Sequence, residues 1–272
     1  MSPERRRTAR GSTLTFVLLV FALSVPFWAL GAVTGLQLLE GLPVSALMAV
    51  CPLVAAAILT YRNEGVRATR ALLARSFDHE RIRRKRWYLP ILLLAPAVMA
   101  LSIVVMHALG SPVPEVRISV LATLGMFVAF FVAAIGEEVG WSGYATDRLL
   151  TRWSALHAGI LLGLVWAIWH AVPYTQAHQT PTWIAWQMLD TVATRVLLVW
   201  LYVNTGRSVF AACVFHAVGN VCVFSLPSAG LRYDPRVTGL ITTLVAAIIT
   251  IVWGPRTLAR LGRARGVTRH TG

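Results

Sequence analysis

The chain has 272 residues, of which 57% are hydrophobic and only 13% are charged, and its mean hydropathy is +0.66. A soluble domain of this size could not cover its core with so few charged residues, so the composition excludes an ordinary soluble protein. The formal net charge of +14 raises nucleic-acid binding as an alternative. We expect no nucleic-acid partner, because the sequence contains no basic module interleaved with aromatic residues.

Long apolar segments recur along the chain. A helix needs about 20 apolar residues to cross about 30 Å of hydrocarbon. Eight segments come close to that length: 13–35, 42–61, 87–109, 117–141, 155–173, 182–203, 207–227 and 237–253. We therefore predict an all-α, polytopic integral membrane protein with about eight transmembrane helices. Residues 1–272 are expected to form a single transmembrane domain with its functional core at about 117–227.

Basic residues are distributed unevenly between the two sides that these segments define. Of the 25 Lys and Arg, 21 fall before the first helix, after the last, or in alternate connections. This positive-inside pattern predicts a protein of the plasma (cytoplasmic) membrane whose N- and C-termini are cytoplasmic. The long basic connection 62–86 is expected to form an amphipathic helix against anionic headgroups, and 142–154 a second interfacial helix. Segment 110–116 is a predicted external turn.

Ionisable side chains within the predicted helices are few. Each costs at least roughly 2.5–3.5 kcal/mol on insertion scales, so such residues usually mark function. Glu137 and Glu138 follow a long apolar run, and adjacent carboxylates in surroundings of low dielectric are a setting for a general base or acid. The alternative is that this pair merely ends the fourth helix at the water. Away from the helix ends, the other ionisable residues of these segments are His170, Asp190, Arg195 and His216, whereas His107 and His157 lie near helix ends.

Two histidines each have a polar or aromatic residue one helical turn away. Trp166 precedes His170 by four residues, and Asn220 follows His216 by four, so each pair shares one helix face. Such side chains can hold a water, a metal ion or an oxyanion. Each alone could equally be an interhelical hydrogen bond.

A shared site requires the glutamates and histidines to lie at one depth. If the fourth helix ended at residue 141, Glu137 would lie near one membrane face and His170 near the other. The conflict disappears if the fourth helix continues toward Arg148. We therefore predict this longer fourth helix, and a fifth helix that starts nearer Leu161.

Three motifs in this order resemble those of the CPBP intramembrane proteases. They are EEVGWSGY at 137–144, WAIWH at 166–170 and HAVGN at 216–220. That family includes the type II CAAX prenyl endopeptidases and bacterial proteins linked to bacteriocin immunity, and its usual pattern is EExxxR, FxxxH and HxxxN. Two positions differ, because Ser142 stands where the family has Arg and Trp166 where it has Phe.

The resemblance implies an intramembrane endopeptidase. Glu137, helped by His170, would activate a water that attacks a peptide carbonyl. His216 and Asn220 would stabilise the oxyanion, and Glu138 would orient the site. The implied partners are the lipid bilayer and a lipidated or membrane-embedded protein substrate, of which prenylated CAAX-type proteins are the best-known class in this family.

The missing Arg at Ser142 leaves Glu138 without its expected partner. We hypothesise that Arg195 supplies that charge, and that Asp190 pairs with Arg195 as well.

Two cofactor states and three rival functions fit these residues. Glu137, His170 and His216 would bind a divalent metal such as zinc, or act without one as a glutamate-type protease. The GxSG sequence at 140–143 suggests a rhomboid-like serine protease with Ser142 as nucleophile and His216 as base. Intramembrane Glu and His also occur in transporters and proton carriers. A non-catalytic immunity protein of the same helical class is the third rival.

Overall fold

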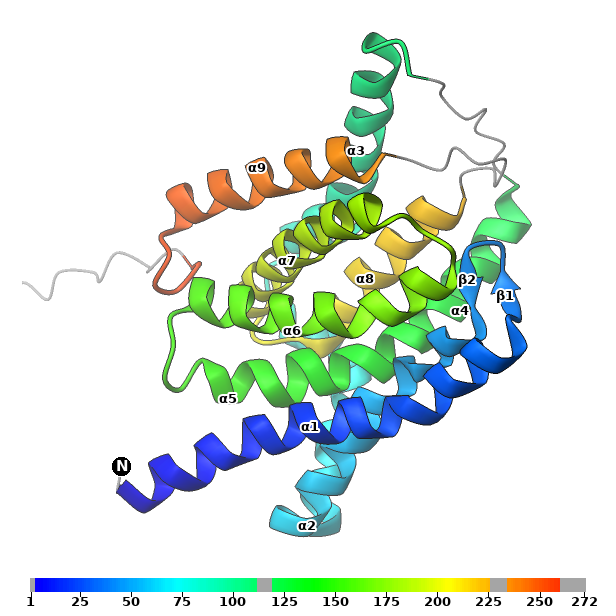
Figure 1. Cartoon of the computed structure of the whole chain (residues 1–272). Helices are drawn as coiled ribbons and strands as arrows, with labels where there is room; N and C mark the ends of the chain where they lie inside the picture. Colours follow the sequence, from blue (N-terminus) through cyan, green and yellow to red (C-terminus); the bar gives the residue numbers. More distant parts are fainter. Residues whose placement is uncertain (1–2, 112–118, 226–233, 260–272) are drawn as a thin grey trace, which may run out of the picture.

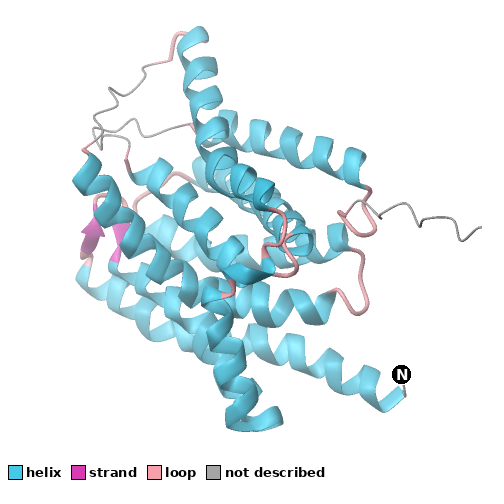
Figure 2. Cartoon of the chain, turned by 180° about the vertical axis from the view of Figure 1, so that it is seen from behind, coloured by secondary structure: helices cyan, strands magenta, loops and turns pink. Residues whose placement is uncertain are grey.

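The computed structural model describes residues 3–111, 119–225 and 234–259. In this part of the chain almost every element is a helix, and the strands are confined to one short antiparallel hairpin (Figures 1 and 2). The helices and strands are α1 (Pro3–Thr34), β1 (Gln37–Leu39), β2 (Leu42–Pro43), η1 (Val44–Val50), α2 (Cys51–Ala74), η2 (Arg75–Phe77), η3 (His79–Arg81), η4 (Lys85–Trp87), α3 (Tyr88–Ala108), α4 (Val120–Glu138), η5 (Val139–Thr146), α5 (Asp147–Leu149), α6 (Ala155–Gln176), α7 (Pro181–Asn204), α8 (Val209–Phe224) and α9 (Pro235–Trp253).

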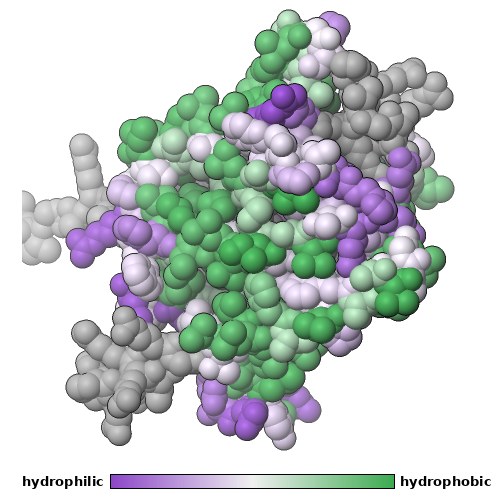
Figure 3. Space-filling model, viewed as in Figure 1, coloured by the Kyte–Doolittle hydropathy of each residue, from purple (hydrophilic) through white to green (hydrophobic). Residues whose placement is uncertain are grey.

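Seven helical stretches of the described residues are long and apolar enough to cross a membrane. Large hydrophobic side chains on them face outward, as Leu121, Val132 and Ile251 do. Figure 3 shows hydrophobic residues over the middle of one face and hydrophilic residues gathered toward its edges. The prediction of an all-α, polytopic integral membrane protein is confirmed.

The eighth predicted segment is the short helix α8, which has 16 residues. At about 1.5 Å per residue it is only about 24 Å long. It packs against α3, α4 and α7, and the side chains of its first half are mostly buried (Figure 1). Its hydrophobicity therefore belongs largely to the protein interior rather than to a lipid-facing surface.

The fourth helix continues well past its apolar run, as predicted. Residues Val120–Leu149 form one helical stretch in which α4 passes into the π-helix η5 and then α5. The predicted interfacial helix at 142–154 is therefore wrong. The side chains of η5 are all buried, because Trp141 and Tyr144 pack against Phe16 of α1.

Two other sequence predictions need correction. The helix predicted within the basic segment 62–86 is shorter than that segment: the non-helical Gly65, which has a φ of 80°, divides α2 into two helices, the second ends at Ala74, and three short 3-10 turns follow. The fifth predicted helix, α6, begins at Ala155 rather than near Leu161. Ser154 caps it there by accepting a hydrogen bond from the His157 amide, which fixes the earlier start.

Small residues let the helices around the site approach closely. A Cβ on Gly140 would lie 2.6 Å from the Pro52 carbonyl carbon, and one on Gly163 would lie 2.9 Å from the Val192 Cα. Such close packing replaces the hydrophobic driving force that helices lack inside a membrane. It brings η5 against α2, and α6 against α7.

Candidate active site

Residues of three helices meet where the predicted site was expected. Glu137 and Glu138 end α4, His170 lies in α6, and His216 and Asn220 lie one turn apart in α8. The π-helix η5 begins directly after Glu138. Short π-helical stretches inside α-helices occur frequently at functional sites.

Glu138 is fully buried and has three side-chain partners. Arg195 of α7 donates from Nη1 to Oε2 at 2.8 Å and from Nη2 to Oε1 at 3.0 Å. His216 Nδ1 lies 3.0 Å from Oε1, and the Ser142 hydroxyl donates a short hydrogen bond to Oε2. Because a buried carboxylate is costly unless it is paired and hydrogen-bonded, this arrangement explains how α4 holds a charge without water.

The hypothesis that Arg195 replaces the missing cation is confirmed by this ion pair. The hypothesis for Asp190 is wrong, because among the described residues no ion pair joins it to Arg195: Asp190 accepts from Gln187 Nε2 at 3.5 Å, and Arg195 bonds to Glu138. Five residues along a helix correspond to a rotation of about 140°, so Asp190 and Arg195 face different ways.

Glu137 is also buried, and Trp166 lies at the centre of its surroundings. The indole Nε1 of Trp166 donates to Glu137 Oε2 at 2.7 Å. The same ring makes edge contacts with His170 and His216, at centroid distances of 5.1 and 5.3 Å. The Arg195 guanidinium lies over its face, 4.0 Å from the centroid, as in a cation–π pair. The sequence analysis noted only that Trp166 stands where the family has Phe. It did not predict this indole hydrogen bond, which Phe could not make.

The hydrogen bonds of the two imidazoles indicate which nitrogen is protonated. His170 Nδ1 lies 2.9 Å from the Trp166 carbonyl oxygen, which can only accept. His216 Nδ1 faces the Glu138 carboxylate. Both rings therefore carry a hydrogen on Nδ1, and in the neutral ring Nε2 is left as the acceptor.

A cavity of about 150 Å³ adjoins these residues. Trp166, His170, His216 and Asn220 lie on its wall, so three of the predicted site residues line it. The rest of the wall combines apolar side chains of α3, α7 and α8 with a set of polar side chains from α6, α7 and α9. The polar side chains are those of Tyr174, Gln187, Asp190, Thr191, Thr194, Thr238 and Thr242. Of these, the sequence analysis had singled out Asp190 alone.

The sequence prediction named Glu137, His170 and His216 as the ligands of a possible metal ion. Among the described residues, no group of three His, Cys, Asp or Glu side chains that could hold a metal ion is found. Glu137 is bonded to an indole, and His216 uses Nδ1 on Glu138. A histidine that ligates zinc through one nitrogen commonly donates from the other to a carboxylate, so the His216–Glu138 contact is compatible with both predicted cofactor states.

Ser142 is placed as a partner of Glu138. It is buried in η5, and its hydroxyl donates to Glu138 Oε2, whereas His216 contacts the other oxygen. Within the described ranges no hydrogen bond joins Ser142 to His216. A serine nucleophile would need such a bond to its base.

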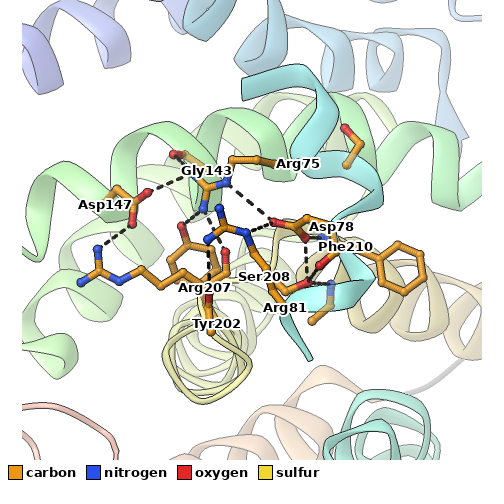
Figure 4. A network of polar contacts seen from close by, with 12 residues as sticks. Arg75, Asp78, Arg81, Gly143, Asp147, Tyr202, Arg207, Ser208 and Phe210 are labelled. Atoms are coloured by element: carbon orange, nitrogen blue, oxygen red, sulfur yellow. Dashed lines mark hydrogen bonds and ion pairs between the residues drawn. The ribbon is translucent and has the colours of Figure 1, made fainter. Parts of the chain in front are cut away.

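A second polar network lies at the N-terminal end of α8, the helix that carries His216 (Figure 4). Asp78 Oδ1 accepts from the Ser208 hydroxyl at 2.8 Å and from the Phe210 amide at 3.1 Å, and so caps α8 from outside. Arg75 donates to the Gly143 carbonyl and to Asp147, both at 2.9 Å. Sequence analysis counted Arg75 among the basic residues expected at lipid headgroups. It instead ties the end of α2 to the π-helix.

Comparison with known proteins agrees with this geometry. Residues 118–222 match the family model described as "Type II CAAX prenyl endopeptidase Rce1-like". This part of the chain is similar to that family. All five predicted site residues, from Glu137 to Asn220, fall inside this part. The chain is also 27% identical over 257 residues to "CAAX prenyl protease 2" of Methanococcus maripaludis, an alignment that covers 86% of this chain and 92% of that protein.

The resemblance seen in the sequence is thus confirmed by two independent comparisons. The matched residues 118–222 span α4 to most of α8, which carry the glutamates, Trp166, Arg195 and the histidines. The description of the matching family and the name of the similar protein both support a membrane protease.

Proposed function

We propose that this protein hydrolyses a peptide bond of a lipidated, membrane-associated protein, with prenylated CAAX-type proteins as the substrate class. The observation that carries the proposal is the pair Glu137–Glu138: Arg195 neutralises Glu138, whereas among the described residues Glu137 has a hydrogen bond only from a neutral indole. One carboxylate is thereby committed to structure, and the other is available as a base beside the cavity. The apolar part of the cavity wall suits a hydrophobic segment of the substrate.

The proposed reaction uses the side chains in the following way. Glu137, with His170, takes a proton from a water whose oxygen attacks the peptide carbonyl carbon. Asn220 and His216 donate hydrogen bonds to the oxyanion, His216 from Nε2 in its protonated form. Glu137 then returns the proton to the leaving amine as the C–N bond breaks.

The first test is cleavage of a quenched, farnesylated CAAX peptide by the purified protein. Glu137→Gln keeps an oxygen that can accept from Trp166 but removes the base, so turnover should fall by about 10²–10⁴-fold. Ser142→Ala removes only a hydrogen bond to Glu138 and should retain most activity. Loss of all activity in Ser142→Ala, with Glu137→Gln active, would instead establish the serine mechanism.

The substrate class has its own control. The same peptide without the farnesyl group should be cleaved much more slowly, because the cavity's apolar wall would lose its ligand. Equal rates on both peptides would reject the lipidated substrate while leaving the peptidase activity in place.

We further propose that the enzyme is of the glutamate type. Support comes from the described His and Glu side chains, which do not converge as metal ligands. Turnover should therefore survive treatment with a zinc chelator, and elemental analysis should find less than one equivalent of zinc per chain. Loss of activity on chelation, with recovery when zinc is restored, would reject this assignment.

A further inference from the structure

Three tryptophans mark one end of the helical bundle. Trp87 precedes α3, Trp200 lies in the last turns of α7, and Trp253 ends α9. Their rings contact one another, with centroids 5.1 to 5.7 Å apart. Since Trp gathers where membrane-spanning helices meet the headgroup region, this cluster indicates the level of a membrane–water interface.

A basic pocket opens beside these tryptophans, away from the active-site cavity. It has a volume of about 600 Å³, and Trp87, Trp253, Asn204 and Gly206 form part of its wall. Its charged lining consists of Glu80, Arg81, Arg83, Arg84 and Arg86. Four guanidinium groups therefore face one carboxylate at the end of three membrane-spanning helices.

Most of this positive charge has no protein counter-charge. Arg81 pairs with Asp78, at 3.2 Å, and donates to the Gly206 carbonyl. The side chains of Arg83, Arg84 and Arg86 are exposed, and none of them has an ion pair or a hydrogen bond with any other described residue. Arginine forks that lack a protein partner match phosphate oxygens in geometry as well as in charge.

We propose that this pocket, lined by Arg81, Arg83, Arg84 and Arg86, binds the phosphate of an anionic phospholipid headgroup. The position at the interfacial tryptophans decides for a lipid over a soluble anion, because a headgroup phosphate lies at that level in every bilayer. The bound lipid would lie against the N-terminal end of α3 and the C-terminal ends of α7 and α9. It would hold these three helix termini together.

The test measures phospholipid binding to the purified full-length chain in detergent by native mass spectrometry. The probes are dioleoyl phosphatidylglycerol, dioleoyl phosphatidylcholine and inorganic phosphate. Phosphatidylglycerol should bind at least about tenfold more tightly than phosphatidylcholine. The triple variant Arg83→Gln, Arg84→Gln, Arg86→Gln should lose at least about tenfold in affinity for phosphatidylglycerol.

The chain offers a matched control triple. Arg62, Arg67 and Arg70 lie in the same basic segment, are also exposed, and do not line the pocket. Their replacement by Gln removes the same net charge and should change the affinity by less than about threefold if the site is local. Equal losses in the two triples, or equal binding of the two phospholipids, would overturn the proposal.

Two further outcomes are informative. Tight binding of inorganic phosphate without a preference for phosphatidylglycerol would assign the pocket to a soluble anion and reject the lipid. If the pocket triple melts at a lower temperature than wild type in phosphatidylcholine, the three single variants replace it, and each should weaken phosphatidylglycerol binding more than Arg67→Gln does.

Discussion

Glu138 and Arg195 are an ion pair from which water is excluded on both sides. The Arg195 and Glu138 side chains both have 0% exposure, and two parallel hydrogen bonds join them. The Coulomb attraction in such surroundings offsets the cost of removing both charges from water only while both are present. Each residue therefore makes the other tolerable inside the membrane.

Arg195→Gln should destabilise the protein by about 3–5 kcal/mol, since it leaves Glu138 as an uncompensated buried charge. Unfolding in detergent followed by a thermal or denaturant probe would measure this. The double variant Glu138→Gln, Arg195→Gln should recover much of the loss, because no charge remains buried. Additive effects in this double-mutant cycle would contradict a direct coupling. Arg236→Gln, which breaks the exposed pair with Asp234, is the control and should change little.

The sequence pointed to these candidate residues because they are ionisable or polar in an apolar background: the two glutamates are adjacent, and each histidine lies one helical turn from a polar or aromatic residue. Glu137, Glu138, His170, His216 and Asn220 all lie in or beside one place in the structure. The Ser142–Glu138 hydrogen bond and the Trp166 indole contact were not foreseen. Both depend on how helices that are distant in sequence rotate against one another, which hydropathy does not specify.

The helix α8 depends for its position on a residue far away in sequence. Asp78 accepts from the Phe210 amide and the Ser208 hydroxyl at its start, and the same helix carries His216 and Asn220. Ser208 also caps the helix by accepting from the Ala211 amide, so without Asp78 the Phe210 amide would lose its partner.

Asp78→Ala should cost about 0.5–2 kcal/mol of stability and should also lower kcat/KM, because α8 shifts. Asp234, which accepts from the Arg236 amide at the start of α9, is a matched control. Asp234→Ala should cost a similar stability but leave kcat/KM nearly unchanged. Equal activity in both variants would show that α8 is held by packing alone.

Close packing between α6 and α7 gives a second prediction at this scale. Gly163→Ala would place a Cβ 2.9 Å from the Val192 Cα and 3.2 Å from the Arg195 Cβ, so we expect a loss of about 1–3 kcal/mol. Gly125→Ala in α4 meets nothing within 4 Å and should be neutral or slightly stabilising. Melting temperatures of the two variants would decide, and equal values would contradict the close approach.

Element boundaries could be predicted only where a physical requirement fixed them. The extension of the fourth helix followed from the need to bring Glu137 and His216 to one depth, and it is confirmed. The start of the fifth helix and the interfacial helix at 142–154 were wrong, because the cap at Ser154 and the π-helix were not recognised.

The arrangement of helix ends indicates how often the whole chain crosses the membrane. Asp78 holds the start of α8 at the end of the bundle where α2 stops, and Trp253 places the end of α9 beside Trp87 at the start of α3. Although α8 is short, it therefore runs toward the opposite end, where α9 begins. Eight crossings put both termini on one side, whereas seven would separate them.

Reporter fusions test this count. Green fluorescent protein joined to residue 272 should fluoresce in intact bacterial cells, as should an N-terminal fusion, because both ends are predicted to be cytoplasmic. Alkaline phosphatase inserted in the segment 110–116 should be active, since that turn is predicted to be external. A fluorescent N-terminal fusion together with a phosphatase-active C-terminal fusion would mean that α8 does not cross.

The buried pair of Glu138 and Arg195 also has a consequence for biosynthesis. The two residues are separated by 57 positions, so α4 leaves the ribosome long before α7 exists. Until then Glu138 must remain protonated or in contact with water, because an unpaired carboxylate in lipid costs several kcal/mol. Helix α4 therefore cannot take up its final position in the membrane until α7 has been synthesised. Translation that stops before Arg195 should leave a fragment that the cell's quality control removes.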